Sequence, residues 1–195
     1  MTIPMPLAPG STNATPPPSS GRLDRLDRSL SRRAALAWPH PRWFTLPLSG
    51  LSLTANYGVL WYVVALLPWV FAEPDPLRKA LYVAVPVTAV EATGYVIKHF
   101  VARQRPPVAD PDQPRQIPLP HSKSFPSSHA SMAVVATFTL ATLYPWALPW
   151  LLAFTAVLCF SRVYLGVHYL GDVLGGLAYG LLFGALWVWL VPVGF

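Results

Sequence analysis

Cysteine and charge are both scarce in this chain of 195 residues. The single cysteine, Cys159, excludes an internal disulfide and a cysteine-based metal cluster. Only 11% of the residues are charged and 53% are hydrophobic, a balance far from that of a soluble globular domain. The composition therefore favours a membrane protein over the alternative, a soluble protein with a large apolar core.

Acidic residues are the scarcer of the two charged types. Eight Asp and Glu stand against 14 Lys and Arg, which gives a net charge of +6. The basic residues form no stripe with interleaved aromatic side chains, so we expect no nucleic acid partner. Six of them lie in the N-terminal arm, where they suit an anionic membrane surface. They are Arg22, Arg25, Arg28, Arg32, Arg33 and Arg42.

The first 45 residues are predicted to form an arm outside the main domain. Residues 1–21 are rich in Pro, Ser, Thr and Ala without apolar periodicity, so we expect them to be disordered. In residues 22–37, leucines at 23, 26 and 30 recur at helical spacing among charged residues. This pattern favours a short helix on the membrane surface, with a solvated basic arm as the alternative.

Residues 46–195 contain the long apolar runs. A helical crossing of the bilayer needs about 20 apolar residues, whereas the segment 43–49 is too short and is interrupted by proline. The expected spans are 51–72, 77–99, 128–144, 146–164 and 171–192. The sequence therefore predicts an all-α fold, a polytopic membrane helical bundle with about five transmembrane helices.

Glu91 lies at membrane depth in the second expected span. An ionised carboxylate there costs roughly 2.5 to 3.5 kcal/mol, so Glu91 is expected to be neutral, paired or facing a wet cavity. Lys98 lies two turns further on the same face and is a candidate partner. Packing against another helix is the alternative, and we assign Glu91 no catalytic role.

Three polar clusters stand at the ends of the expected spans, and the order of the crossings places all three on one side of the membrane. Lys98 and Arg105 end the second span, residues 126–129 open the third, and residues 161–172 bridge the fourth and fifth. We therefore expect the active site at one membrane face. The proline-rich residues 106–126 are expected to form a long loop there.

The cations of these clusters suit a phosphate group. Arg105 and Arg162 can each offer a planar fork to two oxygens, and Lys98 adds a point charge. Ser127 and Ser128, with the backbone N–H groups that open the third span, add donors at a positive helix end. Taken singly, each basic residue also fits an interfacial anchor.

The histidines suit phosphoryl transfer. His168 and Asp172 are four residues apart, so on a helix the carboxylate would lie one turn away and fix the tautomer of a nucleophilic imidazole. His129, on another helix, could donate a proton to a departing alkoxide. A capping or packing pair is the alternative for His168 and Asp172. The surrounding cations would repel a divalent ion, so we expect no metal and no other cofactor.

Three motifs resemble the signature of the type 2 phosphatidic acid phosphatase superfamily. They are residues 98–106 (KHFVARQRP), 126–129 (PSSH) and 161–172 (SRVYLGVHYLGD). The resemblance covers residues 50–192 and implies that His168 forms a phosphohistidine, Asp172 orients it and His129 protonates the leaving group. The residues that it implies for holding the phosphoryl oxygens are Lys98, Arg105, Ser127, Ser128 and Arg162. The chain departs from the family in having serine for the usual glycine at position 128, and in having five expected spans where many members have six.

The resemblance implies a small bacterial lipid phosphate phosphatase, a metal-independent phosphoric monoester hydrolase. Its substrate would be phosphatidic acid, phosphatidylglycerol phosphate, a polyprenyl phosphate or diphosphate, or a lipid-linked sugar phosphate. Members that act on decaprenylphosphoryl-phosphoribose, in cell wall biogenesis, are similar. A lipid phosphotransferase with the same phosphohistidine and a catalytically silent lipid-phosphate binder are the alternatives.

The distribution of basic residues predicts the sidedness of this multi-pass protein of the cell membrane. The arm and the catalytic loop share one side, and only Arg78 and Lys79 lie on the other. Because Lys and Arg are enriched in cytoplasmic loops, we expect the active site on the cytoplasmic face. The sequence leaves a homo-oligomer open.

Overall fold

The computed structural model describes residues 21–113 and 115–194, and these fold into helices. The elements are α1 (Arg22–Ala37), α2 (Arg42–Thr54), η1 (Asn56–Gly58), α3 (Val59–Ala65), α4 (Leu67–Val70), α5 (Pro76–Val101), α6 (Pro106–Ala109), α7 (Ser128–Leu143), η2 (Pro145–Ala147), α8 (Leu148–Tyr164) and α9 (Leu170–Leu190). The all-α prediction is confirmed. The disorder expected for residues 1–21 falls, apart from Gly21, outside the described residues.

The helices include candidate membrane spans. Three stretches are long and apolar enough to cross a bilayer: Pro76–Ala109, Pro145–Tyr164 and Leu170–Leu190. The pair Arg42–Thr54 and Asn56–Val70, bent by 60°, counts as a fourth if it is one span. α7 is apolar but has only 16 residues; it packs against α5, α8 and α9 in the centre of the bundle. The polytopic membrane bundle is therefore confirmed, with three or four spans of full length and α7 as a shorter helix.

The first expected span is interrupted, so the prediction of one continuous helix over 51–72 is wrong. The helix begins earlier, at Arg42, and tolerates Pro47 in its interior. It then breaks at η1, where Tyr57 and Gly58 take left-handed backbone conformations with φ of 54° and 77°. Glycine adopts this conformation without steric cost. The break places the end of α2 beside the polar end of the bundle.

α7 and α9 approach each other through glycines of α9. A Cβ atom on Gly176 would lie 2.5 Å from the carbonyl oxygen of Ser127, and one on Gly180 would lie 2.7 Å from that of Ser131. Only a residue without a side chain allows backbones to approach so closely. The start of α7 is fixed to the start of α9 by a hydrogen bond of 2.9 Å from the Ser127 N–H to the Asp172 carbonyl oxygen.

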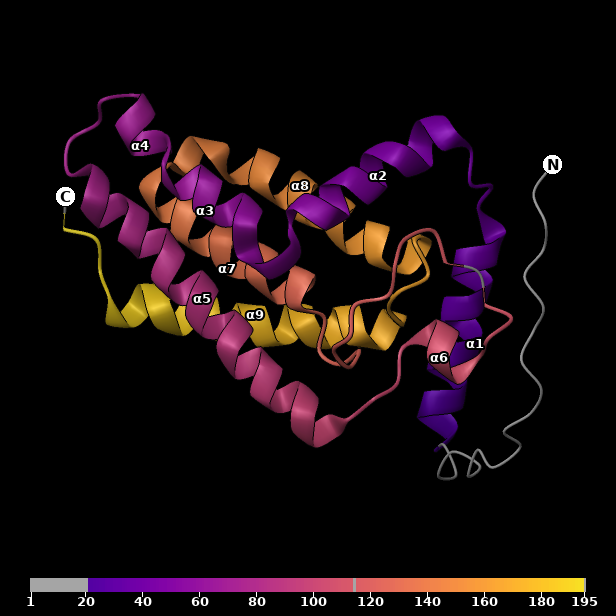
Figure 1. Ribbon diagram of the computed structural model, residues 1–195. Coiled ribbons are helices and arrows are strands. Elements are labelled where there is room, and N and C mark those ends of the chain that lie inside the picture. The colour runs from indigo at the N-terminus through magenta and orange to yellow at the C-terminus, as the bar shows by residue number, and fades with distance from the viewer. Residues whose placement is uncertain (1–20, 114, 195) are drawn as a thin grey trace.

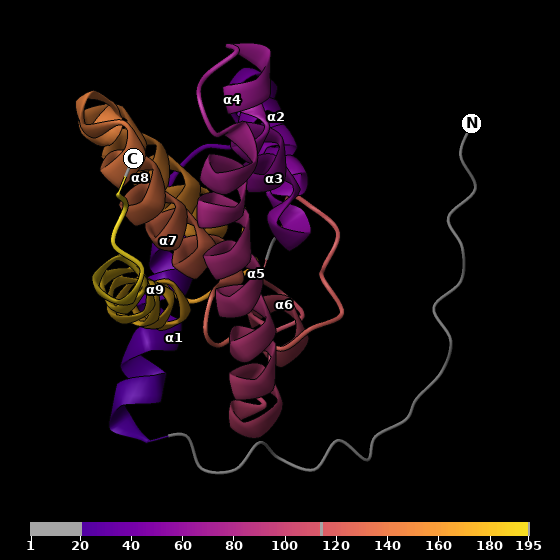
Figure 2. The ribbon, with the colours of Figure 1, turned by 90° about the vertical axis from the view of Figure 1, so that its left-hand side faces the viewer.

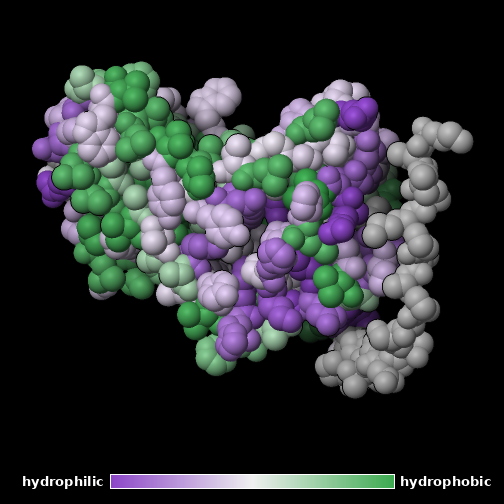
Figure 3. Space-filling view, viewed as in Figure 1, coloured by the Kyte–Doolittle hydropathy of each residue, from purple (hydrophilic) through white to green (hydrophobic). Residues whose placement is uncertain are grey.

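The two ends of the bundle differ in polarity. α1 lies across the end at which α6 and the long loop gather, and the C terminus and the α4–α5 turn lie at the opposite end (Figure 1). Figure 2 looks at the bundle from that opposite end, with α1 furthest from the viewer. Hydrophobic residues cover the surface around α3, α4 and α5, whereas hydrophilic residues gather toward α1 and α6 (Figure 3).

α1 is a helix over the residues that the leucine spacing indicated. Its leucines Leu23, Leu26 and Leu30 are exposed, with 83%, 51% and 52% of their surface accessible. An exposed apolar stripe on a helix at the polar end of a membrane bundle is typical of an interfacial helix.

Candidate active site

One cavity of about 490 Å³ lies where the three polar clusters meet. Six of the eight predicted site residues line it, from α5, α7, α8 and the connecting segments. They are Lys98, Arg105, Ser128, His129, Arg162 and His168. Ser127 and Asp172, both fully buried, are not among the described lining residues and lie behind the wall. The structure therefore brings together residues that are up to 70 positions apart in the sequence.

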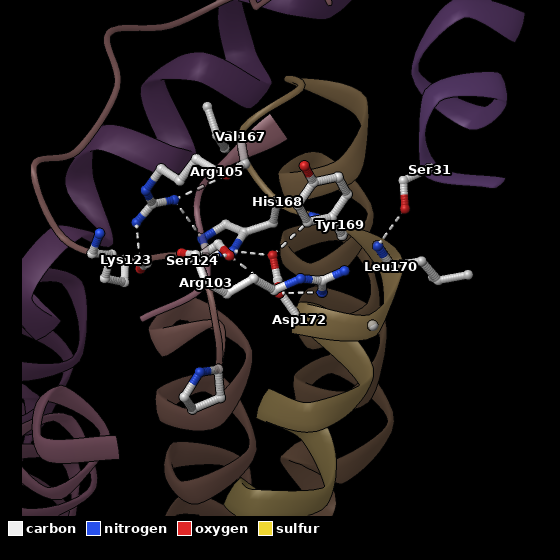
Figure 4. A network of polar contacts seen from close by, with 12 residues as sticks. Ser31, Arg103, Arg105, Lys123, Ser124, Val167, His168, Tyr169, Leu170 and Asp172 are labelled. Carbon is white, nitrogen blue, oxygen red and sulfur yellow. Dashed lines mark hydrogen bonds and ion pairs between the residues drawn. The ribbon is translucent and has the colours of Figure 1, made fainter. Parts of the chain in front are cut away.

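Arg105 fixes the tautomer of His168. Its guanidinium donates hydrogen bonds to the carbonyl oxygens of Val167 and Ser122, at 2.9 and 2.8 Å. Its Nη1 also lies 3.0 Å from His168 Nε2, and since a guanidinium only donates, Nε2 must accept. The proton of a neutral His168 is then on Nδ1, which lies 3.4 Å from Asp172 Oδ2 (Figure 4). Both His168 and Arg105 line the cavity.

The environment of His168 keeps its imidazole neutral. Burial, followed by the positive charges of Arg105, Arg162 and Lys98, holds the pKa of His168 well below its usual value of 6.5. A lowered pKa means that the ring stays unprotonated at neutral pH and below. A neutral imidazole is the form that can attack phosphorus, once its Nε2 lone pair is released from the hydrogen bond with Arg105.

Asp172 is held in the capping box at the start of α9. Its Oδ2 accepts a hydrogen bond of 2.9 Å from the backbone N–H of Tyr169, the N-cap residue. Its Oδ1 accepts one of 2.7 Å from Arg103 and one of 3.4 Å from Ser124 Oγ (Figure 4). His168 precedes the helix, so the expectation that the pair shares one helical turn is wrong. The carboxylate reaches His168 because it turns back over the helix start.

Arg162 is fully buried on α8, yet much of its guanidinium is unpaired. Its Nη1 donates to Ser52 Oγ, whereas Nε and Nη2 have no hydrogen-bond partner among the described residues. Buried donors without acceptors are costly. Two such donors on the wall of a cavity suit the oxygens of a bound anion.

Lys98 and His129 complete the wall. The Lys98 ammonium donates to Ser128 Oγ at 2.9 Å and to the carbonyl oxygen of Pro126. His129 Nε2 lies 2.9 Å from the carbonyl oxygen of Ser52, and because a carbonyl only accepts, this nitrogen carries a proton. His129 is thus a proton-bearing group within the same pocket as His168.

The lining has an excess of positive charge. Among the described lining residues, three are cations and Glu91 is the one carboxylate. Glu91 thus faces the cavity, which is one of the three outcomes expected from its cost at membrane depth, and its Oε2 is buried without a hydrogen-bond partner in the described part of the chain. This excess of positive charge suits the negative charge of a phosphate monoester.

Sequence reasoning missed several polar residues of the site. Arg103 could have been found, because it is a basic residue within the first motif. Only the basic residues at positions 98 and 105 of that motif were predicted as site residues. Ser122 and Ser124 lie in the loop, where no local pattern sets them apart. Ser52 stands in an apolar run, and its contacts with Arg162 and His129 arise from the break after α2.

Comparison with known proteins relates the chain to phosphatases. The profile of the PAP2 superfamily matches residues 79–194. The chain is 33% identical over 140 residues to the decaprenylphosphoryl-5-phosphoribose phosphatase of Mycobacterium tuberculosis, covering 70% of this chain and 75% of that protein. It is 31% identical over 134 residues to the undecaprenyl-diphosphatase BcrC of Bacillus subtilis, covering 67% and 68%.

The fold agrees with this relationship. The crystal structure of a transmembrane PAP2 type phosphatidylglycerolphosphate phosphatase from Bacillus subtilis superposes with a TM-score of 0.70. The match covers 88% of this chain and 87% of that one, at 24% identity, and shows the fold. The phosphatase class predicted from the three motifs is confirmed by the family match, which spans more than half of the sequence. The chain belongs to the PAP2 superfamily.

Proposed function

We propose that this membrane phosphatase hydrolyses the phosphomonoester of a polyprenyl-linked or other membrane lipid, with His168 as its nucleophile. The observation that carries the proposal is the unprotonated Nε2 of His168 beside three cations, one of which, Arg162, holds two unpaired donors. The pocket lies at the polar end of membrane-crossing helices, where a lipid can present its phosphate while its tail stays in the bilayer. The names of the two relatives, which refer to polyprenyl-linked phosphates, support this class of substrate.

The first chemical step forms a phosphoenzyme. Nε2 of His168 attacks phosphorus, an N–P bond forms, and the P–O bond to the lipid alcohol breaks. His129, protonated beside the negative charge of the bound phosphate, gives one proton to the departing oxygen and becomes neutral, a contribution on the order of 10² to 10⁴ in rate. Lys98, Arg105 and Arg162 stabilise the charge on the phosphoryl oxygens, and Asp172 stabilises the positive charge that develops on His168.

The second step returns the enzyme to its starting state. A water molecule attacks the phosphohistidine, the N–P bond breaks, and inorganic phosphate leaves. His129, now neutral, takes the proton of the water. Ser127 and Ser128 lie at the start of α7, whose positive end favours the bound phosphate throughout.

Purified full-length protein in detergent, with a chelator present, is expected to release phosphate from a panel of lipid phosphates. The panel compares a polyprenyl phosphate, a polyprenyl diphosphate, a polyprenyl-linked sugar phosphate and phosphatidic acid, and inorganic phosphate is measured. A new phospholipid formed only with an added acceptor alcohol would favour a phosphotransferase. Lipid binding without phosphate release under any condition would refute the hydrolase proposal and favour a silent binder.

Glu91 is expected to favour monophosphates over diphosphates. Its carboxylate faces the cavity together with the three cations, so it would repel a second phosphate and accept hydrogen bonds from hydroxyl groups of a sugar. A Glu91→Gln variant should raise the ratio of kcat/KM for a polyprenyl diphosphate to that for the matched monophosphate by about 3-fold to 10-fold.

Glu73 offers a matched control for that experiment. It pairs with Lys79 at 2.8 Å and accepts a hydrogen bond from Tyr144 at the opposite end of the bundle. Glu73→Gln is expected to leave the substrate ratio unchanged. An unchanged ratio in Glu91→Gln would remove Glu91 as a determinant of selectivity.

The arm and the sidedness belong to the same proposal. We propose that α1, the helix of the N-terminal arm, lies on the cytoplasmic membrane surface beside the phosphatase domain. The six arginines of the arm support this orientation by the positive-inside rule. A cysteine at the exposed position His121 would test it with an impermeant maleimide, since the native Cys159 is buried. Labelling from outside intact cells would contradict the cytoplasmic placement.

A further inference from the structure

Arg103 joins the N-terminal helix to the carboxylate of Asp172. Its Nη1 donates to Asp172 Oδ1 at 2.7 Å. Its Nη2 donates to Asp27 Oδ2 at 2.7 Å and to Asp24 Oδ1 at 2.9 Å, both on α1. The guanidinium also lies 4.2 Å from the centre of the Tyr169 ring, a cation–π distance. One side chain thus connects three acids from two distant parts of the chain.

α1 also supplies caps to the start of α9. The backbone N–H of Leu170 donates to Ser31 Oγ at 2.8 Å, and that of Gly171 donates to Asp27 Oδ1 at 2.9 Å (Figure 4 shows the first of these). The first N–H groups of a helix have no partner within the helix. Because α1 provides these partners, its docking holds the turn of α9 that carries Asp172.

Arg103 is set apart from the three other basic residues of the site. Lys98, Arg105 and Arg162 line the cavity, whereas Arg103 is not among the described residues that line it. Its contact with the site passes through Asp172, whose other oxygen lies toward His168 Nδ1. Arg103 therefore stands one residue further from the phosphate than the cations that would bind it.

We infer that Arg103 is a positioning residue for Asp172, and that α1 keeps Arg103 in place by the pairs with Asp24 and Asp27. This inference rests on the proposed function, in which Asp172 orients His168. Asp172 is fully buried, and a buried carboxylate is costly unless it is paired. Arg103 supplies that charge and holds Oδ1, so Oδ2 stays directed at Nδ1. Misplacement of a catalytic group by about 1 Å can cost on the order of 10² in rate.

An Arg103→Gln variant of the full-length protein is expected to lower kcat by about 10-fold to 100-fold, with KM changed by less than about 3-fold. Arg103→Lys should recover part of the loss, because lysine keeps the charge but lacks the fork. The matched control is Arg32→Gln, which removes the 3.2 Å pair of α1 with Asp110. We expect the control to retain wild-type kcat.

A double variant tests whether Arg103 acts through Asp172. Arg103→Gln combined with Asp172→Asn is expected to be no slower than Asp172→Asn alone, because residues that act through one group are not additive. Multiplied losses, or a rise in KM with unchanged kcat, would overturn the inference and make Arg103 an independent scaffold or a substrate ligand. If the wild type releases phosphate and Arg103→Gln matches it, this inference fails and the proposed function stands. If the wild type releases none, the proposed function itself fails.

Discussion

A His168→Ala variant is expected to release phosphate about 10⁴-fold more slowly than the wild type, or not at all. The variant lacks the Nε2 atom of His168. In the wild type this nitrogen accepts a hydrogen bond from Arg105 and therefore carries no proton. Without this nitrogen no N–P bond can form, and water must attack the lipid phosphate directly. Uncatalysed hydrolysis of phosphate monoesters is among the slowest reactions known.

The same pair of proteins should also differ in the phosphohistidine intermediate. Rapid quenching of the wild type with a lipid labelled in its phosphate is expected to leave acid-labile label on the protein, and His168→Ala should retain none. His99→Ala is the matched control, since His99 is exposed on α5 and is not among the described lining residues. Full turnover in His168→Ala, or label that persists in it, would end the assignment of the nucleophile.

Replacement of Arg162 by methionine is expected to lower kcat/KM by about 10³-fold. Two donors of its guanidinium are unpaired within the described structure, and the side chain is fully buried beside other cations. We therefore assign those donors to phosphoryl oxygens. Arg162→Lys should recover little of the loss, because a point charge cannot replace a fork that binds two oxygens.

Measurements of thermal stability distinguish a phosphate-binding role of Arg162 from a structural role. A buried charge without a partner destabilises a folded protein, so Arg162→Met is expected to keep or raise the Tm measured without ligand. Inorganic phosphate should raise the Tm of the wild type and leave that of Arg162→Met unchanged. Arg42→Gln, at an exposed position on α2, is the control and should behave as the wild type. A large fall in Tm together with the loss of activity would show that Arg162 supports the fold instead.

The residues that line the cavity could be predicted to lie together because their motif signals are local. The motif spacings identified Lys98, Arg105, His129 and Arg162 as parts of one site, and the structure places all four around one cavity. The geometry of the His168 and Asp172 pair could be predicted only in part. Their spacing indicated contact, but Asp172 reaches His168 from the capping box at the start of α9 and not along a helical turn, because the chain enters α9 only after His168.

The first span shows a second limit of local reasoning. Its apolar composition predicted one crossing over 51–72, whereas the helix breaks at residues 56–58. Tyr57 takes a left-handed conformation there that its own preference disfavours. The break gives Ser52 its place beside Arg162 and His129.

The sequence by itself determined the membrane class, the helical content and the phosphatase family, because hydropathy, periodicity and motif spacing are properties of neighbouring residues. Only the tertiary structure decided which residues α1 contacts. Its leucine spacing predicted a helix, but the pairing of Asp27 with Arg103 joins residues 76 positions apart. Such a contact depends on how the helices pack, and no local pattern records it.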